Sequence, residues 1–311
     1  ELPVAPRKTL ITLLSALVAG ALASVWCLFR ENTRQGITSS DEIEALDLEV
    51  SALVPYSKIQ QKRDTLKRTL TSSNGRSSYL LANENATDTA VEAIRALRTN
   101  IYFSMLDAKN NVLMITGAAP EAGKSFISSN LATVMAQSGK KVLLIDADMR
   151  KGYLEQLFST HVAPGLSELL SGEASPVEAV QQTGIENLFF ISHGNYTQSS
   201  SELLMNKRLG DLIEQASKRY DYVIIDTPPV LAVTDAAIVG QHVGMTLMVA
   251  RYGYTTAQDL DNAARRLVQS NINIKGVILN GIKRDAFNSY NCYSYGSYTA
   301  GSDKKAAKSK G

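Results

Sequence analysis

The stretch VLMITGAAPEAGKSFISSNLATVMAQSG, from Val112 to Gly139, joins an apolar run, a short loop of small residues and a helical pattern. Its central part, AAPEAGKS from Ala118 to Ser125, has the spacing of a phosphate-binding P-loop, with Ala118 in the first small-residue position. Small residues let backbone N–H groups turn toward phosphate oxygens, and the N-terminus of the following helix attracts the same negative charge. The stretch therefore predicts a strand, a loop and a helix that bind the phosphates of a nucleotide.

The side chains of this loop have separate predicted tasks. Lys124 is expected to reach the β- and γ-phosphates of ATP, and the Ser125 hydroxyl to ligate Mg²⁺. The sequence therefore predicts ATP and Mg²⁺ as cofactors. The residues expected at the nucleotide are Ala118, Ala119, Glu121, Ala122, Gly123, Lys124, Ser125, Phe126 and Asn280. The amide of Asn280, at the end of the run VILN, would either read the adenine edge or close a turn.

Two other apolar runs end in carboxylates. VLLIDADMR, which ends at Arg150, carries Asp146 and Asp148, and YVIIDTPP carries Asp226. Open α/β sheets hold their ligands at the carboxyl ends of the strands, and Asp226 is placed there to hold Mg²⁺ through water. Alternate residues of an extended chain point in opposite directions, so Asp146 and Asp148 are expected to do different jobs. The pair alone would also fit a solvated strand end.

Apolar runs and helical segments alternate over much of the chain. The runs are NVLMITG, KKVLLIDAD, NLFFIS, YDYVIIDTPP, MTLMVAR and IKGVILNGI. Each run is continuous, as expected for strands of a parallel sheet that are buried on both faces. The alternation predicts a doubly wound α/β domain of the P-loop NTPase kind, with a mostly parallel sheet, over residues 87–285.

The segments outside this domain differ in composition. Leu10–Phe29 holds no charged residue, and twenty residues make a helix of ~30 Å, so a transmembrane helix is expected over 10–29. Residues 1–9 precede it, and because the first residue is Glu1 we expect a longer parent chain. Residues 30–86 are expected to be a polar linker, either solvated or lying on anionic lipid. Residues 286–311 are expected to form a flexible tail rich in tyrosine.

Composition excludes several classes of protein. The formal net charge is +2, which gives no reason to expect nucleic-acid binding. Cys27 and Cys292 are far apart and suggest neither a disulfide framework nor a metal site, so a reducing compartment fits. The three histidines show no metal-ligand spacing.

The three motifs fit two classes of P-loop protein, a switch ATPase of the MinD/ParA kind and a kinase. Switch ATPases carry a signature lysine five residues before the P-loop lysine, and this position is Ala119 here. The switch reading therefore lacks its characteristic residue. A non-enzymatic scaffold is a third reading, and the intact carboxylates argue against it. After DTPP, Thr234 or Asp235 is expected to cap the next helix.

These motifs together resemble the bacterial tyrosine kinases, in particular the Wzc-like polysaccharide co-polymerases of Gram-negative bacteria. The resemblance covers essentially the whole chain. It rests on AAPEAGKS, LLIDADMR and VIIDTPP, on EAIRALR, on the apolar helix, and on the tyrosine cluster SYNCYSYGSY.

The resemblance implies an activity and a set of roles. Such a protein would transfer phosphate from ATP to tyrosines of its own tail in a neighbouring subunit. Catalysis would depend on Lys124, on Asp146 as the proton acceptor, and on Asp148, which would organise Mg²⁺ together with Ser125 and Asp226. The expected phosphorylated residues are Tyr290, Tyr293, Tyr295, Tyr298 and Tyr153.

The resemblance also implies partners and a location. Glu92, Arg95 and Arg98 lie on one helix face that would meet the next subunit of a ring. The expected partners are further copies of the chain, a cognate tyrosine phosphatase and the machinery of capsule or exopolysaccharide polymerisation and export. The helix would lie in the bacterial inner membrane after a periplasmic segment that ends at residue 9, with the kinase domain in the cytoplasm.

One position departs from the family pattern. The family pairs phosphate on the residue corresponding to Tyr153 with an arginine, and here that place is taken by His193. A histidine carries charge only when protonated, and its reference pKa is ~6.5. The interpretation of Tyr153 therefore stays divided between a regulatory tyrosine and a packed phenol.

Overall fold

The computed structural model describes residues 8–32, 36–57, 59, 80–197, 199–283 and 286–287. The chain divides into two units, Glu1–Gly36 and Ile37–Gly311. The first unit holds helix α1 (Lys8–Asn32), which confirms a helix over the predicted stretch, with side chains described from Leu10 to Trp26. Within the described part of the chain, no helix has both the length and the apolar character needed to cross a membrane.

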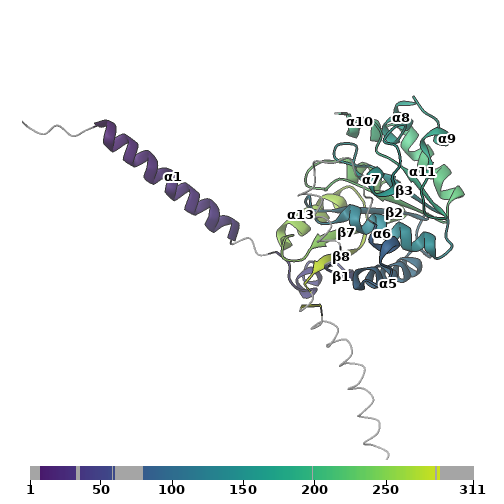
Figure 1. The fold of residues 1–311 in the computed structure, drawn as a ribbon, viewed down its shortest axis with the longest axis horizontal. Helices are drawn as coiled ribbons and strands as arrows, with labels where there is room; N and C mark the ends of the chain where they lie inside the picture. Colours follow the sequence, from purple (N-terminus) through teal and green to yellow (C-terminus); the bar gives the residue numbers. More distant parts are fainter. Residues whose placement is uncertain are drawn as a thin grey trace, which may run out of the picture. The chain divides into compact units, whose positions relative to one another are not determined.

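The second unit is built on one eight-stranded sheet in the order β1-β8-β7-β2-β6-β3-β5-β4 (Figure 1). All neighbouring strands are parallel except β4 and β5, which are antiparallel. The strands are β1 (Val50–Pro55), β2 (Val112–Gly117), β3 (Val142–Asp146), β4 (Gln181–Gln182), β5 (Leu188–Ile191), β6 (Tyr222–Asp226), β7 (Met245–Arg251) and β8 (Ile274–Ile282). The predicted doubly wound, mostly parallel α/β fold is confirmed.

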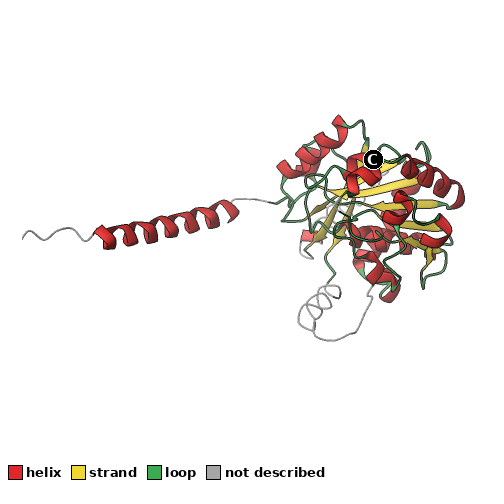
Figure 2. Cartoon of the chain, turned by 90° about the horizontal axis from the view of Figure 1, so that it is seen from above, coloured by secondary structure: helices red, strands yellow, loops and turns green. Residues whose placement is uncertain are grey.

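Helices cover both faces of this sheet (Figure 2). Alternate residues of the fully buried β2 point to two separate cores: Val112 and Met114 join one, Leu113 and Ile115 the other. The helices of the second unit are α2 (Asp41–Glu44), α4 (Leu81–Glu84), α5 (Thr89–Ser104), α6 (Lys124–Gln137), α7 (Leu154–Phe158), α8 (Leu166–Ser171), α9 (Pro176–Ala179), α10 (Ser200–Leu204), α11 (Lys207–Arg219), α12 (Asp235–Gly240) and α13 (Ala257–Gln269). Helices α5 and α6 pack on the core that holds Leu113, and α11, α12 and α13 pack on the opposite core.

The predicted linker over 30–86 is wrong for part of its length. Strand β1 lies inside it and pairs with β8, and Ile37 and Ile43 before the strand are fully buried. The second unit therefore begins near Ile37 and not at residue 87. The strand escaped prediction because it is an edge strand with mixed burial, and it ends in Pro55, a residue that sheets accept mainly at edges and strand ends.

Candidate active site

The P-loop follows β2 and its backbone has the shape that the motif predicts. Gly123 has φ 91° and Glu121 has φ 60°. A Cβ atom built on Gly123 would lie 2.1 Å from Nδ2 of Asn280. Because both the positive φ and the close approach exclude a side chain, this position requires glycine.

The loop is held by a side chain of strand β8 and leads into a helix whose N-terminus has no side-chain cap. Asn280 Nδ2 donates to the carbonyl oxygen of Ala122 at 3.0 Å, and so ties β8 to the loop. Helix α6 begins at Lys124, and in the described chain no side-chain hydrogen bond caps its N-terminus. The first N–H groups of this helix are thus free of side-chain acceptors and suit an anionic ligand.

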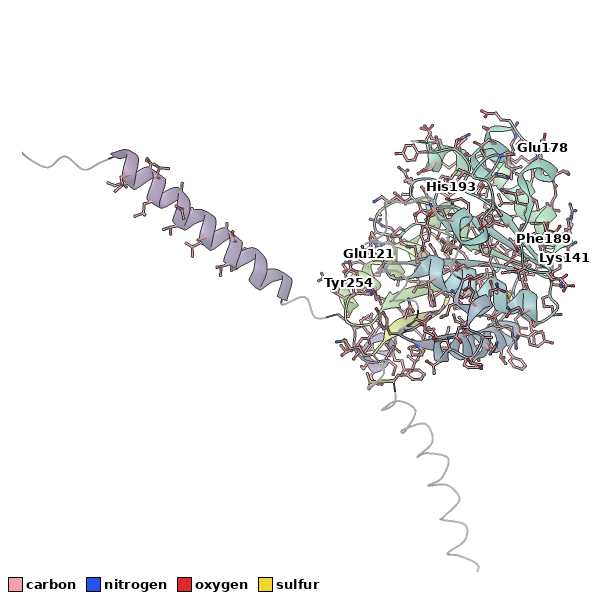
Figure 3. All side chains as sticks on the ribbon, viewed as in Figure 1. Glu121, Lys141, Glu178, Phe189, His193 and Tyr254 are labelled. Carbon is pink, nitrogen blue, oxygen red and sulfur yellow. The ribbon has the colours of Figure 1, made fainter. Side chains whose placement is uncertain are left out.

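Arg251 contacts the P-loop, and the sequence did not predict this contact. It ends β7, and its Nη1 donates to the Glu121 carbonyl at 3.2 Å and lies 3.9 Å from Glu121 Oε2. Glu121 and Tyr254, whose ring lies 5.3 Å from the Arg251 guanidinium carbon, are found on the same side of the domain (Figure 3). The only available signal was an arginine at the carboxyl end of a predicted strand.

Two predicted carboxylates meet at the carboxyl ends of adjacent strands. Asp146 and Asp226 are register partners on β3 and β6, and each is 1% exposed. The Ser125 hydroxyl donates to Asp226 Oδ2 at 2.6 Å, while Asp226 Oδ1 is buried without a hydrogen-bond partner. The structure thus brings the P-loop serine and the two strand-end aspartates together.

Burial dominates the electrostatics of this pair. It raises the pKa of Asp146 well above its usual range, and the charge of Asp226 raises it further. Burial also raises the pKa of Asp226 to about 6, against the lowering effects of the Ser125 hydrogen bond and of Lys124. A carboxylate with a raised pKa is a better proton acceptor near neutral pH than an ordinary aspartate.

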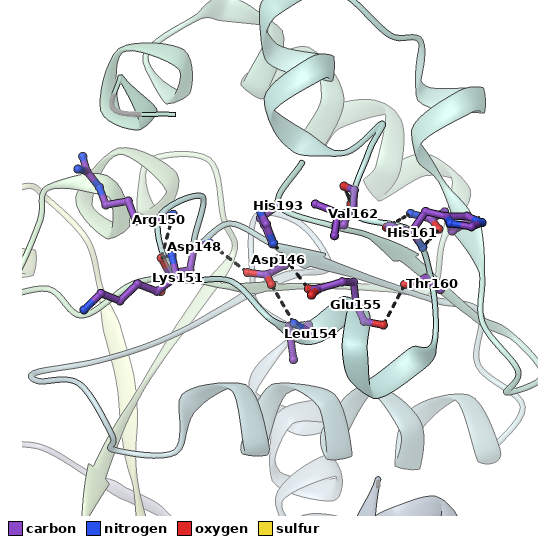
Figure 4. A network of polar contacts seen from close by, with 12 residues as sticks. Asp146, Asp148, Arg150, Lys151, Leu154, Glu155, Thr160, His161, Val162 and His193 are labelled. Atoms are coloured by element: carbon purple, nitrogen blue, oxygen red, sulfur yellow. Dashed lines mark hydrogen bonds and ion pairs between the residues drawn. The ribbon is translucent and has the colours of Figure 1, made fainter. Parts of the chain in front are cut away.

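Asp148 lies in a different environment from Asp146, as the strand geometry predicted. It is partly buried in the turn after β3, where its Oδ1 accepts the backbone N–H groups of Arg150 at 3.3 Å and Lys151 at 2.9 Å (Figure 4). The backbone N–H of Asp148 in turn donates to Asp146 Oδ1 at 3.1 Å. One short turn therefore fixes both carboxylates of the motif.

These oxygen donors fit Mg²⁺ as part of a nucleotide complex. Within the described residues, no cluster of three or more His, Cys, Asp and Glu side chains would hold a metal by itself. Mg²⁺ does not need such a cage, because it commonly binds one or two carboxylates together with water and substrate phosphates. The unpartnered oxygen of Asp226 and the Ser125 hydroxyl beside the P-loop match that pattern.

His193 is committed to a different partner from the one suggested by the family pattern. Its Nε2 lies 3.6 Å from Glu155 Oε2, and both side chains are largely buried (Figure 4). The adjacent Gly194, with φ 82°, packs against Ser167 and Glu168. Tyr153 is 44% exposed just before α7. The other ring nitrogen of His193, Nδ1, is buried without a hydrogen-bond partner among the described residues.

Other predicted residues lie away from this site or outside the described chain. On α5, Arg95 forms an ion pair with Glu92 and donates to the Ala86 carbonyl at 2.8 Å, while Arg98 is partly exposed. Thr234 occupies the N-cap position of α12 as predicted, but its side chain makes no capping hydrogen bond, and the Asp235 carboxylate accepts from Ser200 and Ser201. The tail tyrosines lie outside the described residues: Tyr290, Tyr293, Tyr295 and Tyr298.

Comparisons with known proteins identify relatives across the chain. A family model described as an AAA domain matches residues 112–275. A putative tyrosine-protein kinase in the cps region of Klebsiella pneumoniae is 44% identical over 97% of this chain and 42% of its own length. Tyrosine-protein kinase wzc of Salmonella typhimurium is 46% identical over 96% of this chain and 42% of its own length. The chain thus spans about two fifths of the length of these relatives.

Solved structures agree with these relatives. The kinase domain of Escherichia coli tyrosine kinase ETK superposes with a TM-score of 0.74 at 44% identity, covering 80% of this chain and 96% of that domain. The BceF tyrosine kinase domain gives a TM-score of 0.74 at 46% identity, covering 80% of this chain and all of that domain.

Proposed function

This chain belongs to the family of bacterial tyrosine-protein kinases, and we propose that it transfers the γ-phosphoryl group of ATP to tyrosine hydroxyls. The observation that carries the proposal is the buried Asp146–Asp226 pair beside the P-loop, with Ser125 bonded to Asp226. A tyrosine phenol with pKa ~10 is a poor nucleophile until a base takes its proton. A buried carboxylate with a raised pKa supplies that base.

We assign the roles as follows. Lys124 and the N-terminus of α6 bind the phosphates. Ser125, Asp148 and Asp226 would hold Mg²⁺, which neutralises charge on the phosphates when bound. Asp146 accepts the phenolic proton. The nucleotide contacts are assigned to the P-loop residues Ala118, Ala119, Glu121, Ala122, Gly123 and Phe126, and to Asn280 at the base.

The proposed acceptors are the tail tyrosines Tyr290, Tyr293, Tyr295 and Tyr298 of a neighbouring copy, with Tyr153 as a further candidate. Each phosphate adds about −1.5 to −2 charge, so a fully modified tail would repel the subunits it joins. We propose a ring of subunits that assembles through the α5 face and loosens on phosphorylation.

The cellular setting of this proposal follows from the sequence. No helix of the described residues meets both requirements for crossing a membrane, but the stretch Leu10–Phe29 extends past the last described side chain, Trp26. Because it has no charged residue over twenty positions, we propose that it anchors the chain in the inner membrane, with the kinase domain in the cytoplasm. The relative from Klebsiella pneumoniae is described as encoded in a cps region. We therefore propose control of capsule or exopolysaccharide polymerisation and export, with a cognate phosphatase resetting the tail.

The test is to incubate the full chain with ATP and Mg²⁺ and to map phosphotyrosine by mass spectrometry. We expect phosphate on the tail tyrosines of the wild type and none on Lys124→Met, because the phosphates lose their charged ligand. A copy lacking residues 286–311 serves as the acceptor control and should turn over ATP without tail modification. ATP hydrolysis by the wild type with no phosphotyrosine would contradict the proposal and indicate a switch ATPase.

A further inference from the structure

Asp235 is a buried carboxylate to which the proposed reaction assigns no role. It is the first residue of α12, nine positions after Asp226, and its side chain is 0% exposed. Three side chains from two other segments surround it. Ser200 Oγ donates to its Oδ2 at 3.1 Å, Ser201 Oγ donates to its Oδ1 at 2.5 Å, and Arg150 Nε lies 3.7 Å from its Oδ2.

Arg150 connects this cluster to the proposed metal site. Its backbone N–H donates to Asp148 Oδ1, so it belongs to the turn that orients that carboxylate. Its side chain extends away from Asp146 (Figure 4), and its Nη2 donates to Ser201 Oγ at 3.4 Å. Its Nε is buried without a hydrogen-bond partner, so Asp235 holds this end of the guanidinium mainly by charge.

The loop after β6 gives Asp235 a fixed position relative to the P-loop. Val230 and Leu231 donate their N–H groups to the carbonyls of Gly117 and Ala118 at 2.9 and 3.2 Å. The start of α12, which carries Asp235, is therefore connected to the phosphate loop through these backbone hydrogen bonds. It is connected to the Asp148 turn through Arg150. The serines come from NYTQSSSELL, the segment that directly follows His193 and Gly194.

We propose that Asp235 is a positioning residue for the Mg²⁺–nucleotide site, acting through Arg150 on the turn that carries Asp148. The inference rests on the proposed nucleotide site but not on tyrosine as the acceptor. Removing the charge of Asp235 frees Arg150, and the Asp148 carboxylate then loses its fixed orientation. Outer groups of this kind typically change metal affinity 10- to 100-fold.

The experiment measures binding of a fluorescent ADP analogue to the full chain while Mg²⁺ is titrated. Asp235→Asn keeps the side-chain shape and one acceptor oxygen for the two serines but loses the charge, so we expect the half-saturating Mg²⁺ concentration to rise about tenfold. Affinity for the analogue in EDTA should not change. Asp261→Asn, which removes the carboxylate of an exposed aspartate–arginine pair on α13, is the matched control and should leave both quantities unchanged.

Two further variants keep the test decisive if Asp235→Asn does not fold. Arg150→Gln should raise the Mg²⁺ requirement by a similar factor, and Ser201→Ala should raise it less. The double variant Asp235→Asn with Arg150→Gln should need no more Mg²⁺ for half-saturation than the more affected single variant, because Asp235 acts through Arg150. Unchanged Mg²⁺ dependence, an equal loss of affinity in EDTA, or additive effects in the double variant would overturn the inference.

The two proposals fail in distinguishable ways. A wild type that binds the Mg²⁺–ADP analogue but never phosphorylates tyrosine refutes the kinase and leaves the role of Asp235 to be judged on binding alone. A normal Mg²⁺ requirement in Asp235→Asn refutes the positioning role and leaves the kinase standing.

Discussion

Asp226 illustrates how a single residue at the candidate site affects the stability of the fold. One of its oxygens binds Ser125 and the other is buried without a partner, and burial raises its pKa from 3.8 to about 6. The folded state therefore holds the proton more tightly than the unfolded state does. The resulting contribution to stability is fully present below pH ~4 and is lost as the pH rises through about 6.

This loss of stability with rising pH gives a prediction for the protein without nucleotide and Mg²⁺. Asp226→Asn keeps an acceptor for Ser125 but never ionises, so it should be more stable than the wild type at pH 7.5. A shift from 3.8 to about 6 corresponds to at most about 3 kcal/mol. Urea denaturation at pH 4 and pH 7.5 measures the gain, which should shrink at the lower pH. The exposed control Asp107→Asn should show no such pH-dependent gain. A variant less stable than wild type at pH 7.5 would contradict the assignment.

Gly123 gives a second prediction at this scale. Gly123→Ala meets two obstacles, a φ of 91° and the Asn280 amide at 2.1 Å from the new Cβ. We expect binding of an ATP analogue to weaken by at least about tenfold, since left-handed backbone alone costs an L-residue roughly 1–2 kcal/mol. Calorimetric titration measures this loss. Asn280→Ala removes the steric obstacle but also the hydrogen bond to the Ala122 carbonyl, so it serves as a second background. Gly123→Ala should cost less affinity in that background than in the wild type. No loss at all in that background would mean that backbone conformation is unimportant here.

At the scale of elements, the sequence could predict those features that have a local pattern of residues, but not those that arise only from contacts in the folded chain. The unit from β2 to α6 and the strands ending in Asp146 and Asp226 carry their own signals, because buried parallel strands read as continuous apolar runs. Strand β1 carries a weak signal, because it is an edge strand whose residues are mostly only partly buried, and it does not form a continuous apolar run. The Asp235 cluster carries none: the contact with Ser200 and Ser201 exists only because the fold packs α10 against α12.

Helix α5 supports a prediction about assembly. Arg95 is already bound to Glu92 and to the Ala86 carbonyl, so it also holds the start of its own helix. Arg98 is only partly buried and is the cleaner probe of a subunit contact. We expect Arg98→Ala to reduce the ring to smaller species and the Arg95→Ala, Arg98→Ala double variant to leave monomers, as measured by native mass spectrometry.

The comparison needs an arginine removed elsewhere. Arg265→Ala removes an exposed arginine from α13, where it pairs with Asp261 one turn earlier, and it should leave the assembly intact. Unaltered ring mass in the α5 double variant would refute the proposed interface. Smaller species in all three variants would indicate a general effect of charge.

At the scale of the whole molecule, the kinase fold depends on residues that precede its first motif. Ile37, Ile43 and Val54 are each fully buried, and β1 covers the edge of β8. Burying one such side chain contributes about 1.5–3 kcal/mol, so the three together are comparable with the 5–15 kcal/mol net stability of a typical domain. A fragment that begins at residue 87 discards all of this and exposes a new sheet edge.

Three fragments separate these contributions. A chain of residues 37–311 should unfold cooperatively in urea. A chain of residues 50–311 keeps β1 but loses the two isoleucines, and its transition should fall at a lower urea concentration. A chain of residues 87–311 should be aggregated or show no cooperative transition, because the sheet edge on β8 is uncovered. The measurement is the order of the urea unfolding midpoints of the three fragments. Equal midpoints for the first and third fragments would show that β1 and the segment before it contribute nothing to the stability of the fold. The graded order would place the start of the folding unit near Ile37, well before the first recognisable motif.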